Sequence, residues 1–130
     1  MRVPLNWLKD YIDTNLEARE IASLLTMTGH ALDKPIYEQN GDLIMDLEDR
    51  GNRADTMGII GIARDLAALT GTKLKYPKEA KIPEVNNEKI KPVIKVESAL
   101  VTRWTAVKFR NVKVVTSPEK IQKKLRTYGI

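Results

Sequence analysis

The chain has 130 residues, of which 42% are hydrophobic and 30% are charged, a balance typical of a globular protein. No apolar run approaches the roughly 18 residues that a membrane-spanning helix needs. The sequence has no cysteine and one histidine, His30, which excludes disulfides, thiolate catalysis and multi-histidine metal sites. Charge follows too soon after Met1 for a signal peptide, so we expect a cytoplasmic protein.

The net charge of +5 conceals two halves of opposite sign. Residues 1–72 hold 7 basic and 12 acidic residues, a net charge of −5, whereas residues 73–130 hold 15 basic and 5 acidic residues, a net charge of +10. This asymmetry indicates two units with different electrostatic surroundings. The basic half could face a phosphate backbone. Because its lysines lie in several segments and not in one cluster, a solvated surface or an acidic neighbouring chain is the preferred explanation.

Two short helices are predicted first. Pro4 suits a first helical turn, and Leu5, Leu8 and Ile12 then recur on one face. Thr14 and Glu17 have the spacing of a capping box for the second helix. Its apolar stripe comprises Ala18, Ile21, Ala22, Leu25 and Thr28, and Gly29 is the expected stop.

A β-hairpin is predicted next, because Asn40-Gly41 tolerates the positive φ angles of a two-residue turn. The turn joins residues 36–39 to residues 42–48, where apolar and acidic side chains alternate apart from Ile44. This alternation directs Asp46 and Glu48 towards solvent.

A third helix is expected from Asp55, as its N-cap, to Gly71. Its buried stripe would comprise Ile59, Ile62, Ala63, Leu66 and Leu69. Gly58 and Gly61 inside a helix weaken it by roughly 1 kcal/mol each, which favours a close crossing of another backbone.

Residues 73–90, with Pro77 and Pro83, are predicted to form a linker. Beyond it, residues 93–97 and 104–115 have the β-branched, alternating character of strands. Ser117-Pro118 then opens a helix that ends at Gly129. One face of that helix is apolar, with Ile121, Leu125 and Tyr128; the other is basic, with Lys120, Lys123, Lys124 and Arg126.

Few residues suit catalysis. The sequence has no GxxxxGK[ST] loop, no GxGxxG turn and no GxSxG elbow. The densest carboxylate cluster, which could in principle hold magnesium, comprises Asp46, Glu48, Asp49 and Asp55. Alternation and helix-terminus positions explain these carboxylates without a metal, so we expect no catalytic and no metal site.

Three segments, in order, resemble the N-terminal region of the β subunit of bacterial phenylalanyl-tRNA synthetase. They are MRVPLNWLKDYI, EIASLLTMTGH and DLIMDLEDRGNRADTMGIIGIARDLAALTG, and the later SPEKIQKKLRTYGI resembles the start of that subunit's next large domain. The family's inserted tRNA-binding domain is missing here, because Asn40-Gly41 closes that gap. The chain also stops at Ile130, where the family's editing domain begins. Asn52, Arg53 and Asp55 match a family signature that we interpret as a loop-and-cap device.

The resemblance implies an α+β fold in three parts. A B1-like unit of three helices and a hairpin spans residues 1–72, the linker spans residues 73–90, and a strand-strand-helix portion of a larger B3/B4-like sheet domain spans residues 91–130. It implies a non-catalytic structural or assembly role, with a catalytic α subunit and the remainder of the β subunit as partners. ATP, magnesium and phenylalanine would belong to the full complex only.

Two further expectations remain open. The alternative function is a stand-alone nucleic-acid-binding module, with tRNA as a possible partner, that uses Lys120, Lys123, Lys124 and Arg126 without base preference. The exposed edge and apolar face of residues 91–130 also favour a homodimer through that segment.

Overall fold

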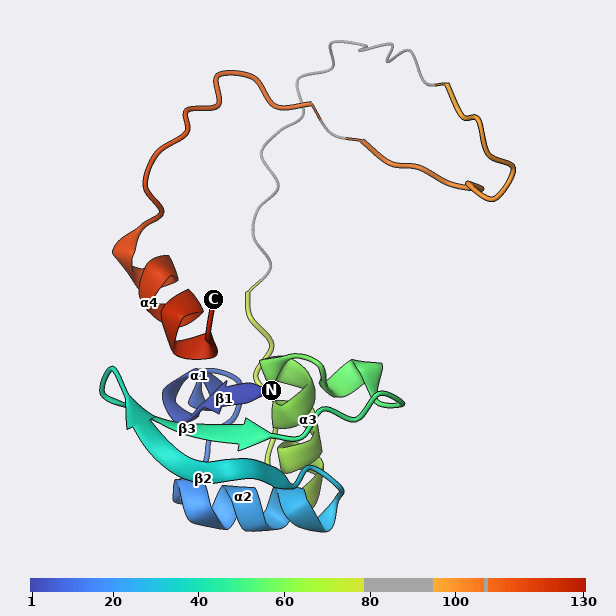
Figure 1. The fold of residues 1–130 in the computed structure, drawn as a ribbon. Coiled ribbons are helices and arrows are strands. Elements are labelled where there is room, and N and C mark those ends of the chain that lie inside the picture. The colour runs from blue at the N-terminus through green and yellow to red at the C-terminus, as the bar shows by residue number, and fades with distance from the viewer. Residues whose placement is uncertain (79–94, 107) are drawn as a thin grey trace. The chain divides into compact units, whose positions relative to one another are not determined.

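The computed structural model describes residues 1–78, 95–106 and 108–130. Two compact units result: residues 1–78 with residues 117–130, and residues 79–116. The first unit is an α+β arrangement of a small antiparallel sheet and helices (Figure 1). None of the helices in the described part of the chain is long and apolar enough to cross a membrane.

The sheet has three strands, in the order β1-β3-β2. Strands β2 (Leu32–Gln39) and β3 (Asp42–Leu47) form the predicted hairpin, with Gln39 opposite Asp42. Asn40 and Gly41 have φ angles of 55° and 76°, as a tight two-residue turn requires. The Asn40-Gly41 turn is therefore confirmed.

The third strand, β1 (Arg2–Pro4), was not predicted from the sequence. It pairs with β3, with Val3 opposite Met45 and Pro4 opposite Ile44. Pro4 is thus the last residue of a strand and the N-cap of α1 (Leu5–Lys9), so its placement inside the first helical turn was wrong. A proline is tolerated there because β1 is an edge strand and short.

Helix α2 (Ala18–Met27) begins later than Thr14 suggested. Glu17 is its N-cap, and the backbone N–H of Glu17 donates to Glu20 Oε2 at 2.7 Å. The capping-box assignment to Thr14 and Glu17 was therefore wrong. The box is formed by Glu17 and Glu20, which have the same three-residue spacing, so spacing alone could not distinguish the two pairs. Gly29, at φ 97°, follows the helix as expected, and the predicted stripe is buried except for Thr28.

Helix α3 (Ile59–Thr70) also starts later than predicted. Asp55 lies in a short 3₁₀ helix, η1 (Ala54–Thr56), and Gly58 is the N-cap of α3. Gly71 ends the helix at φ 68°, as expected. The buried face differs from the predicted stripe, since Leu69 is exposed while Gly61 and Ala67 are buried.

The hydrophobic core lies between β1, β3 and the helices α1, α2 and α3. Its largest fully buried members are Leu8, Ile12, Ile21, Leu25, Met45, Leu47, Ile62 and Leu66. Asp46 was predicted to face solvent, but it is only 7% exposed. Its carboxylate lies 3.5 Å from Lys34 Nζ and 3.5 Å from the Met1 nitrogen, and these contacts compensate a buried charge.

The C-terminal helix α4 (Glu119–Tyr128) has the predicted extent, and Gly129 follows it at φ 106°. Its N-cap is Pro118, not Ser117. Contacts with β1 group α4 with residues 1–78, whereas the sequence placed it with residues 91–130. Tyr128 packs on the core of this first unit, while Ile121 and Leu125 are 50% and 37% exposed.

The second unit contains no helix or strand among its described residues. The strand expected at 104–115 is therefore wrong for the residues that can be described, and so is the end of the strand expected at 93–97. Residues 93 and 94, like the linker beyond residue 78, lie outside the described residues. The boundaries at 73–90 and the homodimer through residues 91–130 stay predictions.

Candidate functional site

Two groups of polar side chains stand out in the first unit. One is a network around Arg53, between the loop before η1, helix α3 and His30. The other is a basic groove beside α4, α1 and the hairpin turn. The sequence predicted residues in both places, but it did not predict their partners.

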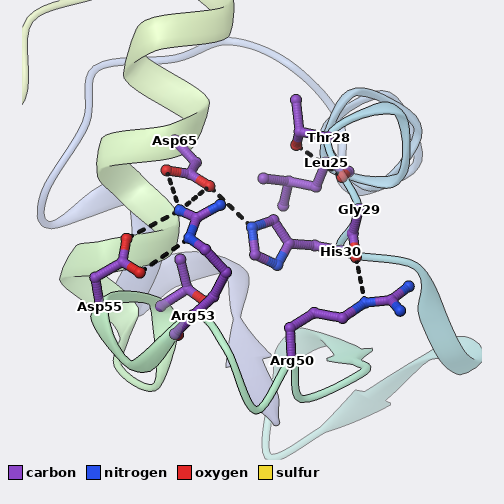
Figure 2. Close-up of polar contacts among 9 residues, drawn as sticks. Leu25, Thr28, Gly29, His30, Arg50, Arg53, Asp55 and Asp65 are labelled. Atoms are coloured by element: carbon purple, nitrogen blue, oxygen red, sulfur yellow. Dashed lines mark hydrogen bonds and ion pairs between the residues drawn. The ribbon is translucent and has the colours of Figure 1, made fainter.

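Arg53 is the centre of the first group, which we call the Arg53 network (Figure 2). Its guanidinium donates to both carboxylate oxygens of Asp55 at 2.9 Å, and to Asp65 at 2.9 and 3.1 Å. On the far side of Asp65, the ring Nε2 of His30 lies 2.9 Å from Oδ2. An ionised carboxylate only accepts hydrogen bonds, so this ring nitrogen carries the proton.

Burial increases along the network from Arg53 to His30. The Arg53 and Asp55 side chains are 36% and 45% exposed, Asp65 is 18% exposed and His30 is 2% exposed. The hydrogen bonds from Arg53 lower the pKa of the Asp55 carboxyl, and the same bonds to Asp55 and Asp65 raise the pKa of Arg53. A charged carboxylate pair and a fixed guanidinium thus tie the loop to α3.

The structure contradicts the capping role that the loop-and-cap interpretation gave to Asp55. Arg53 and Asp55 are brought together, but Asp55 accepts from Arg53 and does not cap α3. Asn52 is exposed, and its side chain makes no hydrogen bond within the described part of the chain. Two members of the network, His30 and Asp65, were missed, because 35 positions separate them and no local pattern links them.

The loop itself is held by a second arginine. Arg50 Nε donates to the carbonyl oxygen of Gly29 at 2.7 Å (Figure 2). Its Nη2 also lies 3.0 Å from Glu48 Oε2. Gly29 directly precedes His30. The loop that carries Arg50 and Arg53 is therefore linked to residues 29–30 twice, directly through Arg50 and through Asp65 from Arg53. The hydrogen bonds among Arg53, Asp65 and His30 fix this loop against α3.

The acidic cluster of the sequence does not assemble into one site. Asp46 contacts Lys34, Glu48 contacts Arg50, and Asp55 contacts Arg53. Among the described residues, no group of three or more acidic, histidine or cysteine side chains is placed to hold a metal ion.

The predicted RNA-contact residues divide into two pairs. Lys120 and Lys123 are exposed, while Lys124 Nζ lies 2.7 Å from Asp10 and 4.9 Å from the centre of the Trp7 ring. Arg126 donates to Gln122 within α4 at 2.9 Å. The three lysines line one groove, together with Pro4, Asn6, Trp7, Asp10, Asn40, Gly41, Asp42 and Thr127.

Comparison with known proteins gives one consistent result. The β subunit of phenylalanine–tRNA ligase from Rhodopirellula baltica is 34% identical over 139 aligned positions, covering all of this chain and 19% of that protein. The subunit from Synechocystis is 35% identical over 88 positions, covering 68% of this chain and 11% of its own length. The chloroplastic subunit from Porphyra purpurea is 29% identical over 135 positions, covering 99% of this chain and 18% of that protein.

This chain thus spans less than a fifth of the length of these relatives. The 139 aligned positions include all 130 residues of this chain. The aligned region of the Rhodopirellula subunit therefore contains no domain-sized insert. No protein-family model matches the chain. No solved structure matches it either. Over its whole length, the chain is similar to part of the phenylalanine–tRNA ligase β subunit.

Proposed function

We propose that this chain is a non-catalytic structural portion of a phenylalanine–tRNA ligase β subunit. Similarity to such subunits along the full chain is the observation that carries the proposal. Two features of the first unit suit a structural role. It has a buried hydrophobic core, and the hydrogen bonds of Arg53 to Asp65 tie the loop before η1 to helix α3. A catalytic α subunit and the remainder of the β subunit are the proposed partners, and ATP-dependent charging of tRNA belongs to the complex.

The test is co-expression of the full chain with the α subunit of the same organism, followed by affinity purification through a tag on this chain. We expect a stable complex, and no aminoacylation or ester hydrolysis by the chain alone. Free α subunit in the flow-through would contradict the assembly role. Any of these activities in the purified chain would contradict the non-catalytic role.

The stand-alone nucleic-acid-binding module is the second candidate. It is favoured by the position of Lys120, Lys123 and Lys124 on one groove. Failure to bind the α subunit, together with RNA affinity that falls steeply with salt, would favour this candidate over the first.

A further inference from the structure

A pocket of about 420 Å³ lies beside the Arg53 network, where the turn after α2 meets the loop before η1. We call it the His30 pocket, and its lining residues are Thr28, Gly29, His30, Arg50, Asn52 and Arg53. None of these lining residues is acidic, although the carboxylates of Asp55 and Asp65 bond to the same Arg53 side chain. A ligand in the pocket would therefore meet two arginines and a histidine without meeting a carboxylate. The volume suits a small molecule.

His30 leaves one ring nitrogen without a partner. Its side chain is 2% exposed, and Nε2 is bonded to Asp65. Nδ1 has no hydrogen bond within the described part of the chain, where no polar side-chain atom is both fully enclosed and unpartnered, so Nδ1 is reached from the pocket. Figure 2 shows this nitrogen turned away from Asp65, towards the space between the Arg50 and Arg53 side chains. Because Nε2 carries the proton, Nδ1 of the neutral ring accepts a hydrogen bond.

Each arginine of the pocket keeps one amino group for a ligand. Arg53 uses Nε and Nη2 for its two carboxylate partners, and Arg50 uses Nε and Nη2 for Gly29 and Glu48. Neither Nη1 atom has a partner among the residues that the structure describes. Two guanidinium donors and one imidazole acceptor are therefore available on side chains that line the same pocket.

The surrounding charges restrict the class of ligand. Glu48, Asp55 and Asp65 pair with the two arginines, so these five side chains carry two positive and three negative charges, a net charge of −1. This balance disfavours a polyanion, such as a nucleic acid or a dicarboxylate. A single carboxylate can still accept charge-assisted hydrogen bonds from both guanidinium groups, because none of the three acidic side chains lines the pocket.

We propose that the His30 pocket binds a small hydroxy monocarboxylate. The carboxylate accepts hydrogen bonds from Nη1 of Arg50 and Nη1 of Arg53, and the hydroxyl group donates to Nδ1 of His30. Such a ligand matches the two donors, the one acceptor and the low net charge of the site. Asn52 also lines the pocket, and its exposed amide is a further donor. The site lies within the first unit and does not rest on the proposed structural role.

His30 is its own reporter, because it is the only histidine in the sequence. Long-range ¹H–¹⁵N spectra of the full chain labelled with ¹⁵N-histidine therefore show which ring nitrogen is protonated without further assignment. Titration uses lactate and 3-hydroxypropionate, which carry the hydroxyl group on different carbon atoms. With at least one of them, we expect the Nδ1 resonance to move saturably towards that of a hydrogen-bonded acceptor while Nε2 keeps its proton.

Matched ligands test each group separately. Propionate lacks the hydroxyl group and should bind about 3- to 10-fold more weakly than the better hydroxy acid, because one hydrogen bond is lost. Lactamide keeps the hydroxyl group of lactate but lacks the charge. It should bind more weakly than lactate, because hydrogen bonds to an ionised acceptor are roughly twice as strong as neutral ones.

A pair of variants locates the site. Asn52→Glu adds a carboxylate at the pocket and removes no hydrogen bond of the described residues. It should weaken binding several-fold, since a tethered carboxylate competes at high effective concentration. Asn15→Glu adds the same charge at an exposed position outside the pocket, and should leave the affinity unchanged. Circular dichroism of both variants should match that of the parent chain.

Four results would overturn the proposal. They are an Nδ1 resonance that neither hydroxy acid moves, propionate or lactamide binding as tightly as the hydroxy acids, equal weakening by the two glutamate variants, and tighter binding of inorganic phosphate than of either hydroxy acid. The last would assign the pocket to phosphate. None of these measurements involves the α subunit, so failure here is distinguishable from failure of the structural role.

Discussion

A Cβ atom at Gly61 would lie 1.9 Å from the carbonyl oxygen of Asp55. The first turns of α3 therefore pass directly against η1, and the sequence expectation of a close crossing is confirmed at this glycine. At Gly58 a Cβ atom would meet nothing within 4 Å, and the residue is an extended N-cap. The two glycines are three positions apart but have different structural roles: Gly61 allows the close approach of η1, whereas Gly58 is the N-cap of α3.

This difference predicts effects of different size for the two alanine substitutions. Gly61→Ala should destabilise the chain by about 2 kcal/mol or more, because backbone must move to admit the methyl group. If no clash existed, the substitution would stabilise α3 by up to about 1 kcal/mol. Gly58→Ala should cost only about 0.5–1 kcal/mol, because alanine is a poorer N-cap than glycine but meets no clash there. Urea unfolding of both variants measures this contrast, and equal effects would contradict the close crossing.

The hairpin turn gives a second prediction. Gly41→Val should destabilise the chain by about 1–3 kcal/mol, because a β-branched residue resists the φ of 76° at this position. Gly51→Val is the control, since Gly51 is exposed and a Cβ atom there would have no neighbour within 4 Å. Thermal unfolding followed by circular dichroism compares them. A neutral Gly41→Val would contradict the turn geometry.

The Arg53 network predicts energetic coupling between His30 and Asp65. A double-mutant cycle with His30→Leu and Asp65→Asn should give a coupling free energy above about 0.5 kcal/mol, because the two side chains share a hydrogen bond in a buried site. His30→Leu alone should cost about 1–3 kcal/mol. Met27→Leu, at a side chain 85% exposed, is the control for a substitution outside the network. Additive single effects would show that the bond contributes nothing.

The Asp55 carboxyl predicts a pH dependence of stability. Its pKa is lowered in the folded chain by Arg53, so folding favours the ionised form. This contribution is complete above the unfolded pKa of about 3.9 and is lost as pH falls through the folded value. Asp55→Asn should therefore lower stability at roughly pH 6 and converge with the parent near pH 2. Asp33→Asn, at an exposed position, should show a smaller difference from the parent than Asp55→Asn at roughly pH 6.

Hydrogen exchange should separate the two units. Amides of α3 should be protected well beyond those of the described residues between 108 and 116, which form no helix or strand. Amides of α4 should be protected in the dilute monomer as well, because Trp7 and Lys124 hold this helix on the first unit. Exchange in α4 as fast as in residues 108–116 would show that the helix does not stay docked.

Local chemistry determined much of this protein from its sequence. Asn40-Gly41 permits the positive φ angles of a two-residue turn whatever surrounds it, and Gly71 and Gly129 end helices for the same reason. The periodic apolar residues of α2 and α3 identified most of the buried face of each helix. The family resemblance likewise depended on consecutive residues, and the comparisons confirm it.

Only tertiary structure decided the features that join distant residues. Strand β1 forms because β3 has a free edge with which it can pair. No local pattern in Arg2–Pro4 predicts this pairing. Asp46 is buried because Lys34 and the Met1 nitrogen reach it, against the alternation of its own strand. His30 meets Asp65, and Lys124 meets Trp7, across 35 and 117 positions of chain. Periodicity reports which face of an element is apolar, but the partner of a polar side chain is set by packing of the whole unit.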